Sequence, residues 1–245
     1  MRLPQMVLFD YGQTLVNQQK FDGVRGTAEV LKYAVRNKYN LTAEQVQREV
    51  ESINRDLGRL DPAMRHLFLV EVPDSMFNAY IYEAQGIEIP LPPEEIGRIF
   101  WDAAAPGVPT QGMADFLGFL KRKGIRTGVV SNISHSRQVV ADRINRLLPE
   151  NEFEFIITSS NYVFRKPHRR IFQLALEKAD LPAEKVWYIG DEYECDIKGA
   201  QGAGITPIWY IGAIDLPYEE QAGICTVREW TELEDKMKGM EEGLR

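Results

Sequence analysis

Short apolar segments alternate with amphipathic helical segments over the second half of the chain, and this alternation constrains the fold more than any other feature. Runs such as Phe153–Thr158 and Thr206–Ile211 are too short for helices and are rich in β-branched and aromatic residues. Strands that alternate with helices form βαβ units around a parallel sheet. The other predicted strands are Met6–Phe9, Arg126–Val130, Lys185–Ile189 and Ile224–Val227. The sequence therefore predicts an α/β fold with a parallel sheet flanked by helices.

A long helical region separates the first predicted strand from the others. Apolar residues three and four positions apart predict helices over residues 26–39, 42–57, 74–84 and from Pro93 through Phe100. Thr42 and Gln45 form a capping-box pattern at the start of the second helix. We expect residues 17–108 to be an inserted all-helical cap domain, with hinges near Val16-Asn17 and Pro106-Gly107. Residues 1–16 and 109–245 would then form the core.

The charge and cysteine content exclude several classes of protein. The formal net charge is −7, because 36 acidic residues outnumber 29 lysines and arginines, and this disfavours nucleic acid or an anionic membrane as a partner. The two cysteines, Cys195 and Cys225, suit neither a zinc cluster nor a disulfide framework. No apolar stretch approaches the ~18 residues that a bilayer span needs. We expect a cytoplasmic protein with no nucleic-acid or membrane partner, and we derive no oligomeric state.

Polar side chains stand at the ends of three predicted strands. Asp10 follows the first strand, Ser131 and Asn132 follow the second, and Asp191 follows the strand that ends at Ile189. Parallel strands bring their carboxyl ends to one edge of the sheet, where ligands bind in open α/β folds. Each group alone fits an ordinary turn or cap. Together with a lysine in the loop before the last of these strands, they describe a site for a hard cation and a phosphate-like anion.

Four segments resemble, in order, the four motifs of the haloacid dehalogenase (HAD) superfamily. They are Asp10-Tyr11-Gly12-Gln13-Thr14-Leu15, Val130-Ser131-Asn132, Lys166-Pro167, and the segment from Gly190-Asp191-Glu192 through Asp196 to Ala200. The helical insertion resembles the subclass with a cap between the first and second motifs. The resemblance implies a Rossmann-like core and hydrolysis of a small phosphorylated metabolite.

The resemblance also implies a role for each residue of the motifs. Asp10 would be the nucleophile that forms an aspartyl phosphate, which splits one displacement into two easier ones. Mg²⁺ would be held by Asp10, the backbone carbonyl of Gly12 and Asp191, a donor set that suits this ion. The metal would reduce the repulsion between an anionic nucleophile and an anionic phosphate.

The resemblance assigns the remaining motif residues to the phosphoryl group and to the surroundings of the metal. Ser131 and Asn132 would bind substrate, with Ser131 bonded to the phosphoryl oxygens and Asn132 beside it. Lys166 would neutralise the phosphate and orient Asp10. Asp196 would support the metal or Lys166 from behind, and Glu192 lies beside Asp191.

The first motif departs from the family pattern at one position. Phosphatases of the family carry an aspartate two residues after the nucleophile, where this chain has Gly12. A glycine offers a carbonyl to the metal but no proton, and proton transfer contributes ~10²–10⁴-fold to a rate. Glu192 is the first candidate for a substitute acid and His135 the second. Gly12 also leaves open a non-catalytic phospholigand-binding protein, a phosphonatase or a dehalogenase.

The expected cap contains the residues on which substrate selection would depend. A phosphonatase needs a cap lysine, for which Lys20, Lys32 and Lys38 are the candidates. Residues available to contact an anion are Lys20, Arg25, Arg65 and His66. We expect His168, outside the cap, to be structural or exposed.

Overall fold

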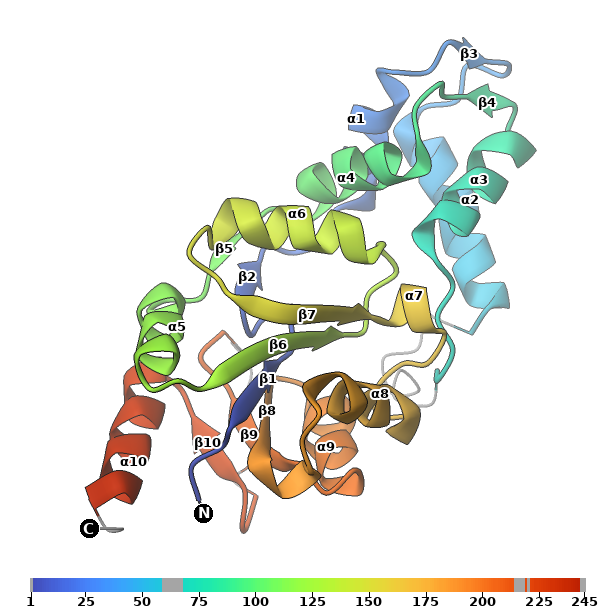
Figure 1. The fold of residues 1–245 in the computed structure, drawn as a ribbon. Helices are drawn as coiled ribbons and strands as arrows, with labels where there is room; N and C mark the ends of the chain where they lie inside the picture. The colour runs from blue at the N-terminus through green and yellow to red at the C-terminus, as the bar shows by residue number, and fades with distance from the viewer. Residues whose placement is uncertain (1, 59–67, 214–218, 220, 243–245) are drawn as a thin grey trace.

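The computed structural model describes residues 2–58, 68–213, 219 and 221–242, and its fold is shown in Figure 1. The strands are β1 Met6–Phe9, β2 Val16–Gln18, β3 Arg36–Asn37, β4 Ile87–Glu88, β5 Gly107–Pro109, β6 Arg126–Ser131, β7 Phe153–Thr158, β8 Val186–Gly190, β9 Thr206–Tyr210 and β10 Cys225–Val227. The helices are α1 Gly23–Leu31, α2 Ala43–Asp56, α3 Asp74–Ala84, α4 Pro93–Ala104, α5 Met113–Arg122, α6 Arg137–Leu147, α7 Ser159–Tyr162, α8 Arg169–Ala179, α9 Lys198–Gly202 and α10 Trp230–Glu242.

The core is a six-stranded parallel sheet in the order β10-β9-β8-β1-β6-β7. The central strand β1 is buried on both faces, as its uninterrupted apolar sequence predicts. Val7 and Phe9 belong to the apolar cluster that includes residues of α5, α6 and α10, whereas Met6 and Leu8 belong to the cluster with α8 and α9. Figure 1 shows these two helical layers on opposite faces of the sheet. The predicted fold class is confirmed.

The predicted elements agree with the structure except near the ends of some helices. Strand β7 and helix α3 occupy the predicted residues, and Thr42 and Gln45 form the predicted capping box. The helix predicted over residues 26–39 ends at Leu31, because backbone hydrogen bonds pair the following segment with strand β4. This pairing joins segments far apart in the sequence, so helical periodicity does not reveal it.

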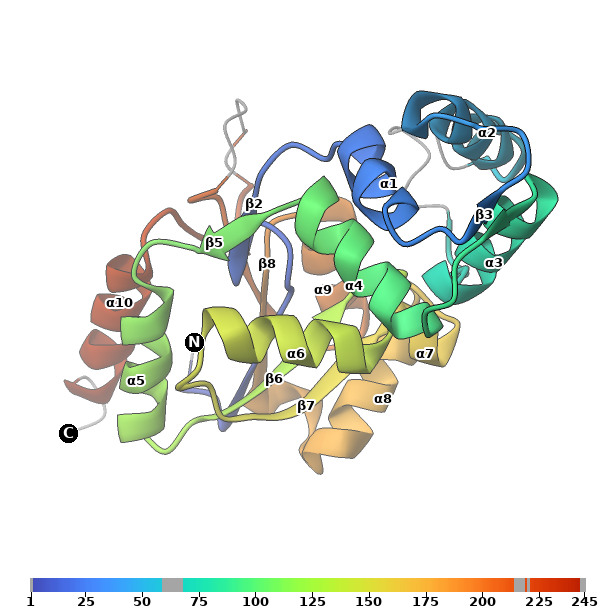
Figure 2. The same cartoon turned by 90° about the horizontal axis from the view of Figure 1, so that it is seen from above.

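Helices α1 to α4 and the β3–β4 pair form a separate layer, which we call the cap. Val30, Val46, Ile81 and Ile96 contribute one side chain from each helix to its apolar cluster. In Figures 1 and 2 the cap lies beyond the carboxyl ends of β6 and β7, and α4 runs beside α6. The structure adds the short β3–β4 pair to the helices that the sequence predicts.

The chain passes between core and cap through β2 and β5, which pair antiparallel. This pairing includes both predicted boundaries, since Val16 faces Pro109 and Asn17 faces Val108. The domain limits and the hinges stay predictions. Among the described residues, no helix is long and apolar enough to cross a membrane.

Candidate active site

The predicted polar residues meet at the carboxyl edge of the sheet. Asp10 directly follows β1, Ser131 is the last residue of β6, and Asp191 directly follows β8. Strand β1 pairs with both β6 and β8, so the three positions are neighbours across the sheet. The backbone amide of Asp10 donates to the carbonyl of Ile189 at 2.8 Å, which extends the ladder to the aspartate. The sheet therefore fixes the backbone of Asp10.

Lys166 reaches this edge from the loop between α7 and α8 and is almost fully buried. Its ammonium donates to Asp10 Oδ1 at 2.7 Å and to Asp196 Oδ1 at 2.6 Å. Burial alone would lower the pKa of Lys166, but the charges of the two carboxylates outweigh it and raise that pKa above its usual value. Lys166 is therefore a fixed cation beside Asp10.

Tyr188 is a third partner of Lys166 that the sequence did not predict. Its hydroxyl accepts from the ammonium at 2.7 Å and donates to the carbonyl of Val130 at 2.9 Å. The residue lies in the middle of β8, two positions before Gly190, and is fully buried. A buried tyrosine hydroxyl needs a hydrogen-bond partner, so a tyrosine in a buried strand near a motif is a signal that could have found it.

Asn132 holds the main chain of Lys166 with both ends of its amide. Its Nδ2 donates to the carbonyl of Lys166 at 2.9 Å, and its Oδ1 accepts from the amide of Lys166 at 2.6 Å. The contact of Asn132 with substrate that the sequence predicts stays a prediction, and Asn132 lines the cavity above Asp10. Its two hydrogen bonds also keep Lys166 in place beside the end of β6.

Three carboxylates, those of Asp10, Asp191 and Asp196, have ligand atoms within 4.8 Å of one another. Burial raises the pKa of Asp191 well above its usual value, and the nearby charge of Asp10 raises it further. Burial also raises the pKa of Asp196, to about 6, against the effect of Lys166. Carboxylates that repel one another in a buried position form a donor set that a hard cation satisfies. The side chains therefore fit the predicted magnesium site.

A cavity of about 760 Å³ opens above these residues. It is lined by all of the residues to which the sequence assigns a role in catalysis, substrate binding or metal binding, except Asp196, which lies fully buried behind Lys166. Gly12 also lines it, and a Cβ atom there would lie 3.1 Å from Oε1 of Gln18. Glu192 and His135, the two candidates for a substitute acid, line the same cavity.

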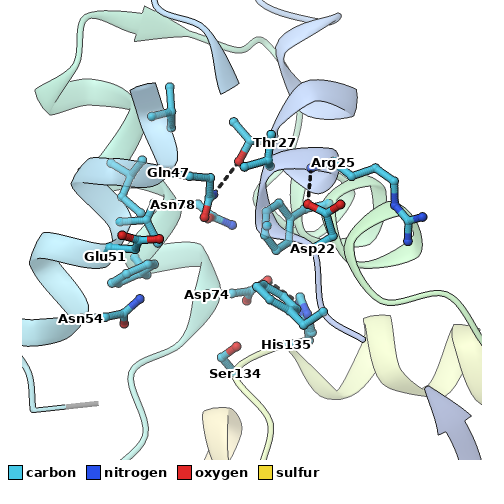
Figure 3. Close-up of a pocket in the computed structure, with 18 of the residues that line it drawn as sticks. Asp22, Arg25, Thr27, Gln47, Glu51, Asn54, Asp74, Asn78, Ser134 and His135 are labelled. Atoms are coloured by element: carbon cyan, nitrogen blue, oxygen red, sulfur yellow. Dashed lines mark hydrogen bonds and ion pairs between the residues drawn. The ribbon is translucent and has the colours of Figure 1, made fainter. Parts of the chain in front are cut away.

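A second cavity of about 810 Å³ lies within the cap, as Figure 3 shows. It shares Gln19, Lys20, Phe21, Ser134 and His135 with the cavity above Asp10. Its walls include apolar residues of α2 and α3, together with the amides of Gln47, Asn54 and Asn78. The two cavities therefore adjoin at the line where cap and core meet.

The predicted cap residues lie in different places. Lys20 lines both cavities, whereas Lys32 pairs with Glu29 on the surface and Lys38 lies over the ring of Tyr39. Arg25 lines the cap cavity and donates to the carbonyl of Ala103. Arg65 and His66 lie outside the described residues. His168 is the N-cap of α8 and stacks on Phe164, which supports the structural role expected for it.

Glu71 and Arg165 form a second buried ion pair beside the motifs, which the sequence did not predict. Glu71 also accepts from the hydroxyl of Ser159 at 2.7 Å, and its backbone amide donates to the carbonyl of Val163. These contacts join the segment after α2 to the loop that carries Lys166. The partners are far apart in the sequence, so no local pattern could have revealed them.

Comparison with known proteins agrees with this geometry. The sequence matches the haloacid dehalogenase-like hydrolases over residues 4–204. It is 31% identical over 107 residues to the glyceraldehyde 3-phosphate phosphatase of Pyrococcus furiosus, a match that covers 42% of this chain and 44% of that relative. It is 26% identical over 205 residues to the pyrimidine 5'-nucleotidase YjjG of Escherichia coli, covering 83% and 84%.

Solved structures share the fold over nearly the whole chain. The HAD phosphatase from Thermococcus onnurineus has a TM-score of 0.61 at 18% identity, covering 98% of this chain and 99% of its own. The 2-haloacid dehalogenase from Pseudomonas syringae pv. Tomato DC3000 has a TM-score of 0.63 at 19% identity, with the same coverage. The chain belongs to the haloacid dehalogenase-like hydrolase family.

Proposed function

We propose that the protein hydrolyses phosphate monoesters of small metabolites through a phosphoryl group carried on Asp10. The observation that carries the proposal is the buried contact of Asp10 with Lys166, at an edge where a second carboxylate lies within reach of a shared cation. The ammonium of Lys166 holds Oδ1 of Asp10 in place at 2.7 Å, and a carboxylate is a nucleophile that forms covalent intermediates. The cavity above it leaves room for a phosphate ester.

The residues around Asp10 bind the phosphoryl group or position the residues that bind it. Lys166 neutralises the charge that the phosphoryl oxygens bring and keeps Oδ1 of Asp10 in place. Ser131, buried at the end of β6, offers its hydroxyl to those oxygens. Asn132 acts through Lys166, because both ends of its amide are bonded to the main chain of that residue.

Asp10, Asp191 and the carbonyl of Gly12, a residue that lines the same cavity, would hold the cation. Bound Mg²⁺ would supply positive charge that favours the approach of the phosphate oxygens. Asp196 serves Lys166 and also accepts the backbone amide of Glu192 at 3.0 Å through its second oxygen. It thereby orders the loop that carries Asp191.

The substrate class is supported by the names of the relatives. One is named for glyceraldehyde 3-phosphate and another for pyrimidine 5'-nucleotides, which are phosphate monoesters of small metabolites. The chain spans less than half of the first of these relatives. We therefore infer from these relatives only that the protein hydrolyses a phosphate monoester, and we do not infer which alcohol the phosphate is attached to.

The test is phosphate release from acetyl phosphate and p-nitrophenyl phosphate with and without Mg²⁺, in the wild type and in Asp10→Asn. We expect metal-dependent release that Asp10→Asn abolishes, and an acid-quenched reaction that yields a phosphorylated peptide containing Asp10. Equal release by the variant would refute the proposal. Thermal melting of both proteins controls for folding.

A second candidate function is a binding protein for phosphorylated ligands that does not turn them over. Gly12 favours it, because the acid that assists phosphatases of this family is absent from that position. This alternative predicts that phosphorylated ligands raise the melting temperature without any release of phosphate. The same assays separate the two candidates.

A further inference from the structure

The site needs a proton donor for the leaving oxygen, and Gly12 does not provide one. Expulsion of an alkoxide is slow unless an acid protonates it, and a donor must lie in the cavity that holds the ester. Glu192, which directly follows Asp191, also lines this cavity. His135 lines the cavity from the loop after β6, four residues beyond Ser131.

His135 is held in one orientation by contacts with three separate elements. Its Nδ1 lies 2.7 Å from Oδ2 of Asp74 in α3, and its ring stacks on Trp101 of α4 with 4.4 Å between centroids. Its carbonyl accepts from the hydroxyl of Ser160 at 2.6 Å. Within the described part of the chain, Nε2 of His135 has no hydrogen-bond partner. The imidazole is therefore fixed by one nitrogen and leaves the other available.

Asp74 is placed for this contact by the main chain. Its backbone amide donates to the carbonyl of Ser134 at 3.0 Å, so the first residue of α3 is bonded to the loop that carries His135. Figure 3 shows Asp74 and His135 facing each other at the border of the cap cavity. A carboxylate on one imidazole nitrogen fixes the orientation of the ring and directs the other nitrogen into the site.

Gly97 in helix α4 leaves space for the contact between Asp74 and His135. It lies inside α4, where glycine costs about 1 kcal/mol relative to alanine. A Cβ atom there would come within 2.4 Å of Oδ2 of Asp74 and 3.5 Å of Nδ1 of His135. The helix thus lacks a side chain at the point where the carboxylate of Asp74 meets the imidazole.

We infer that His135, oriented by Asp74, is the general acid and base of this site in the place of the carboxylate that Gly12 lacks. The inference rests on the proposed function. Because Asp74 and Trp101 belong to the cap, the cap and the core must be in contact for the acid to be complete. His135 itself lies on the core, so the cap contacts determine the orientation of the proton donor and not its presence in the cavity.

The proton balance over one turnover is as follows. A carboxylate oxygen of Asp10 bonds to phosphorus while the bond from phosphorus to the leaving oxygen breaks, and that oxygen takes the proton from Nε2 of His135. Water then attacks phosphorus as its proton passes to the now neutral Nε2. The bond between phosphorus and Asp10 breaks, which releases inorganic phosphate and restores the protonated imidazole.

The experiment compares His135→Gln with the wild type on substituted phenyl phosphates whose phenols differ in acidity, all with Mg²⁺. We expect kcat/KM to fall ~10²-fold for the least acidic phenol and less than ~3-fold for the most acidic one, because only poor leaving groups need the acid. The dependence of log kcat/KM on phenol pKa should become steeper. Equal losses across the series would show that His135 only joins cap and core, and would overturn the inference.

Three further measurements keep the outcomes distinct. His168→Gln, a histidine stacked on Phe164 and outside both cavities, should leave the slope unchanged. Asp74→Asn should steepen the slope less than His135→Gln does, and imidazole in solution should restore turnover of the poorest ester by His135→Ala. If the wild type releases phosphate from none of these esters or from acetyl phosphate, the proposed function fails; if it does so with an unchanged slope in His135→Gln, only this inference fails.

Discussion

The edge of the sheet and the cap above it position their polar side chains by different means. At the edge, Asp10, Ser131 and Asp191 stand at the ends of paired parallel strands, and the backbone ladder determines their separation. In the cap, Asp74 meets His135 across 61 residues of sequence through the packing of α3 and α4 against the core. Backbone pairing therefore determines the positions of the polar side chains at the edge, whereas tertiary packing determines the contact between Asp74 and His135.

This difference indicates how changes in each region should act. At the edge, the buried side chains of Asp10, Asp196 and Tyr188 are linked through Lys166, so that removing one leaves others without a partner. At the border of the cap, Asp74 and His135 line a cavity. We expect large losses of stability and activity at the edge, and selective losses of activity in the cap.

Lys166→Met should have the largest effect and tests the edge directly. It leaves Asp10 and Asp196 buried without their cation, and breaking a buried pair costs about 3–5 kcal/mol. Turnover should fall by ~10²–10³-fold or more. Chemical denaturation and phosphate release measure the two effects. The control Lys198→Met removes a lysine that pairs with Glu194 on the surface and should change neither.

The region with the largest expected effects is also the one that the sequence predicted best. A strand that ends in a polar residue places that residue at the edge of a parallel sheet, so the positions of Asp10, Ser131 and Asp191 along the chain are enough to group them. Lys166 was found because its motif lies between two of these strands. The partners of the Tyr188 hydroxyl were not predicted, because Lys166 and Val130 lie on other elements, although a buried tyrosine hydroxyl is itself a signal that it has partners.

Sequence patterns could not predict the contacts that depend on packing between distant segments. The Asp74–His135 contact and the Glu71–Arg165 pair each join elements that meet only through tertiary packing. The motif identified Asn132, but not its two hydrogen bonds to the main chain of Lys166, because a motif position does not reveal where an amide points. The same limit explains why the predicted first cap helix continued past Leu31.

Removal of the metal tests whether the carboxylates of Asp10, Asp191 and Asp196 repel one another enough to destabilise the folded protein. Since burial raises the pKa of Asp191 and Asp196, the folded metal-free protein binds protons that the unfolded chain releases. Stability without metal should therefore fall as the pH rises from about 4, the value of a free aspartate, through about 6 for Asp196. Mg²⁺ at a hundred times its Kd should restore about 2.7 kcal/mol at neutral pH.

Melting curves recorded with EDTA and with Mg²⁺ between pH 5 and pH 8 (about one unit below the Asp196 value to two above it) measure this effect. The stabilisation by Mg²⁺ should grow as the pH rises and should shrink in Asp191→Asn. A stabilisation that is the same at every pH would mean that these carboxylates do not repel one another in the folded protein.

Asn132→Ala should have an intermediate effect, because it disturbs the edge without removing a charge. The amide and the carbonyl of Lys166 lose their partners, which costs about 1–3 kcal/mol. Displacement of Lys166 should lower kcat by ~10- to 100-fold. If Asn132 instead contacts substrate, KM should rise while stability stays unchanged. Asn145→Ala, at an exposed asparagine on α6, is the matched control.

Gly97→Ala should have the smallest effect on stability and tests the cap. Alanine favours the helix by about 1 kcal/mol, but its Cβ would overlap Oδ2 of Asp74, and overpacking costs about 1–3 kcal/mol. The net loss should be small, whereas displacement of Asp74 should slow the turnover of esters with poor leaving groups. Denaturation curves and the series of phenyl phosphates measure the two effects.

Gly239→Ala separates the helical gain from the overlap, because Gly239 lies inside α10 and a Cβ atom there would have no neighbour within 4 Å among the described residues. That variant should gain about 0.5–1 kcal/mol with unchanged kinetics. If Gly97→Ala is stabilised to the same extent, then Asp74 moves away from the added Cβ atom without loss of stability, and the packing of α4 does not fix the contact between Asp74 and His135. If Gly97→Ala instead loses stability together with turnover of every ester, then the contact between Asp74 and His135 responds to substitution as the buried edge does. In that case the two regions differ only in how far apart their residues lie in the sequence.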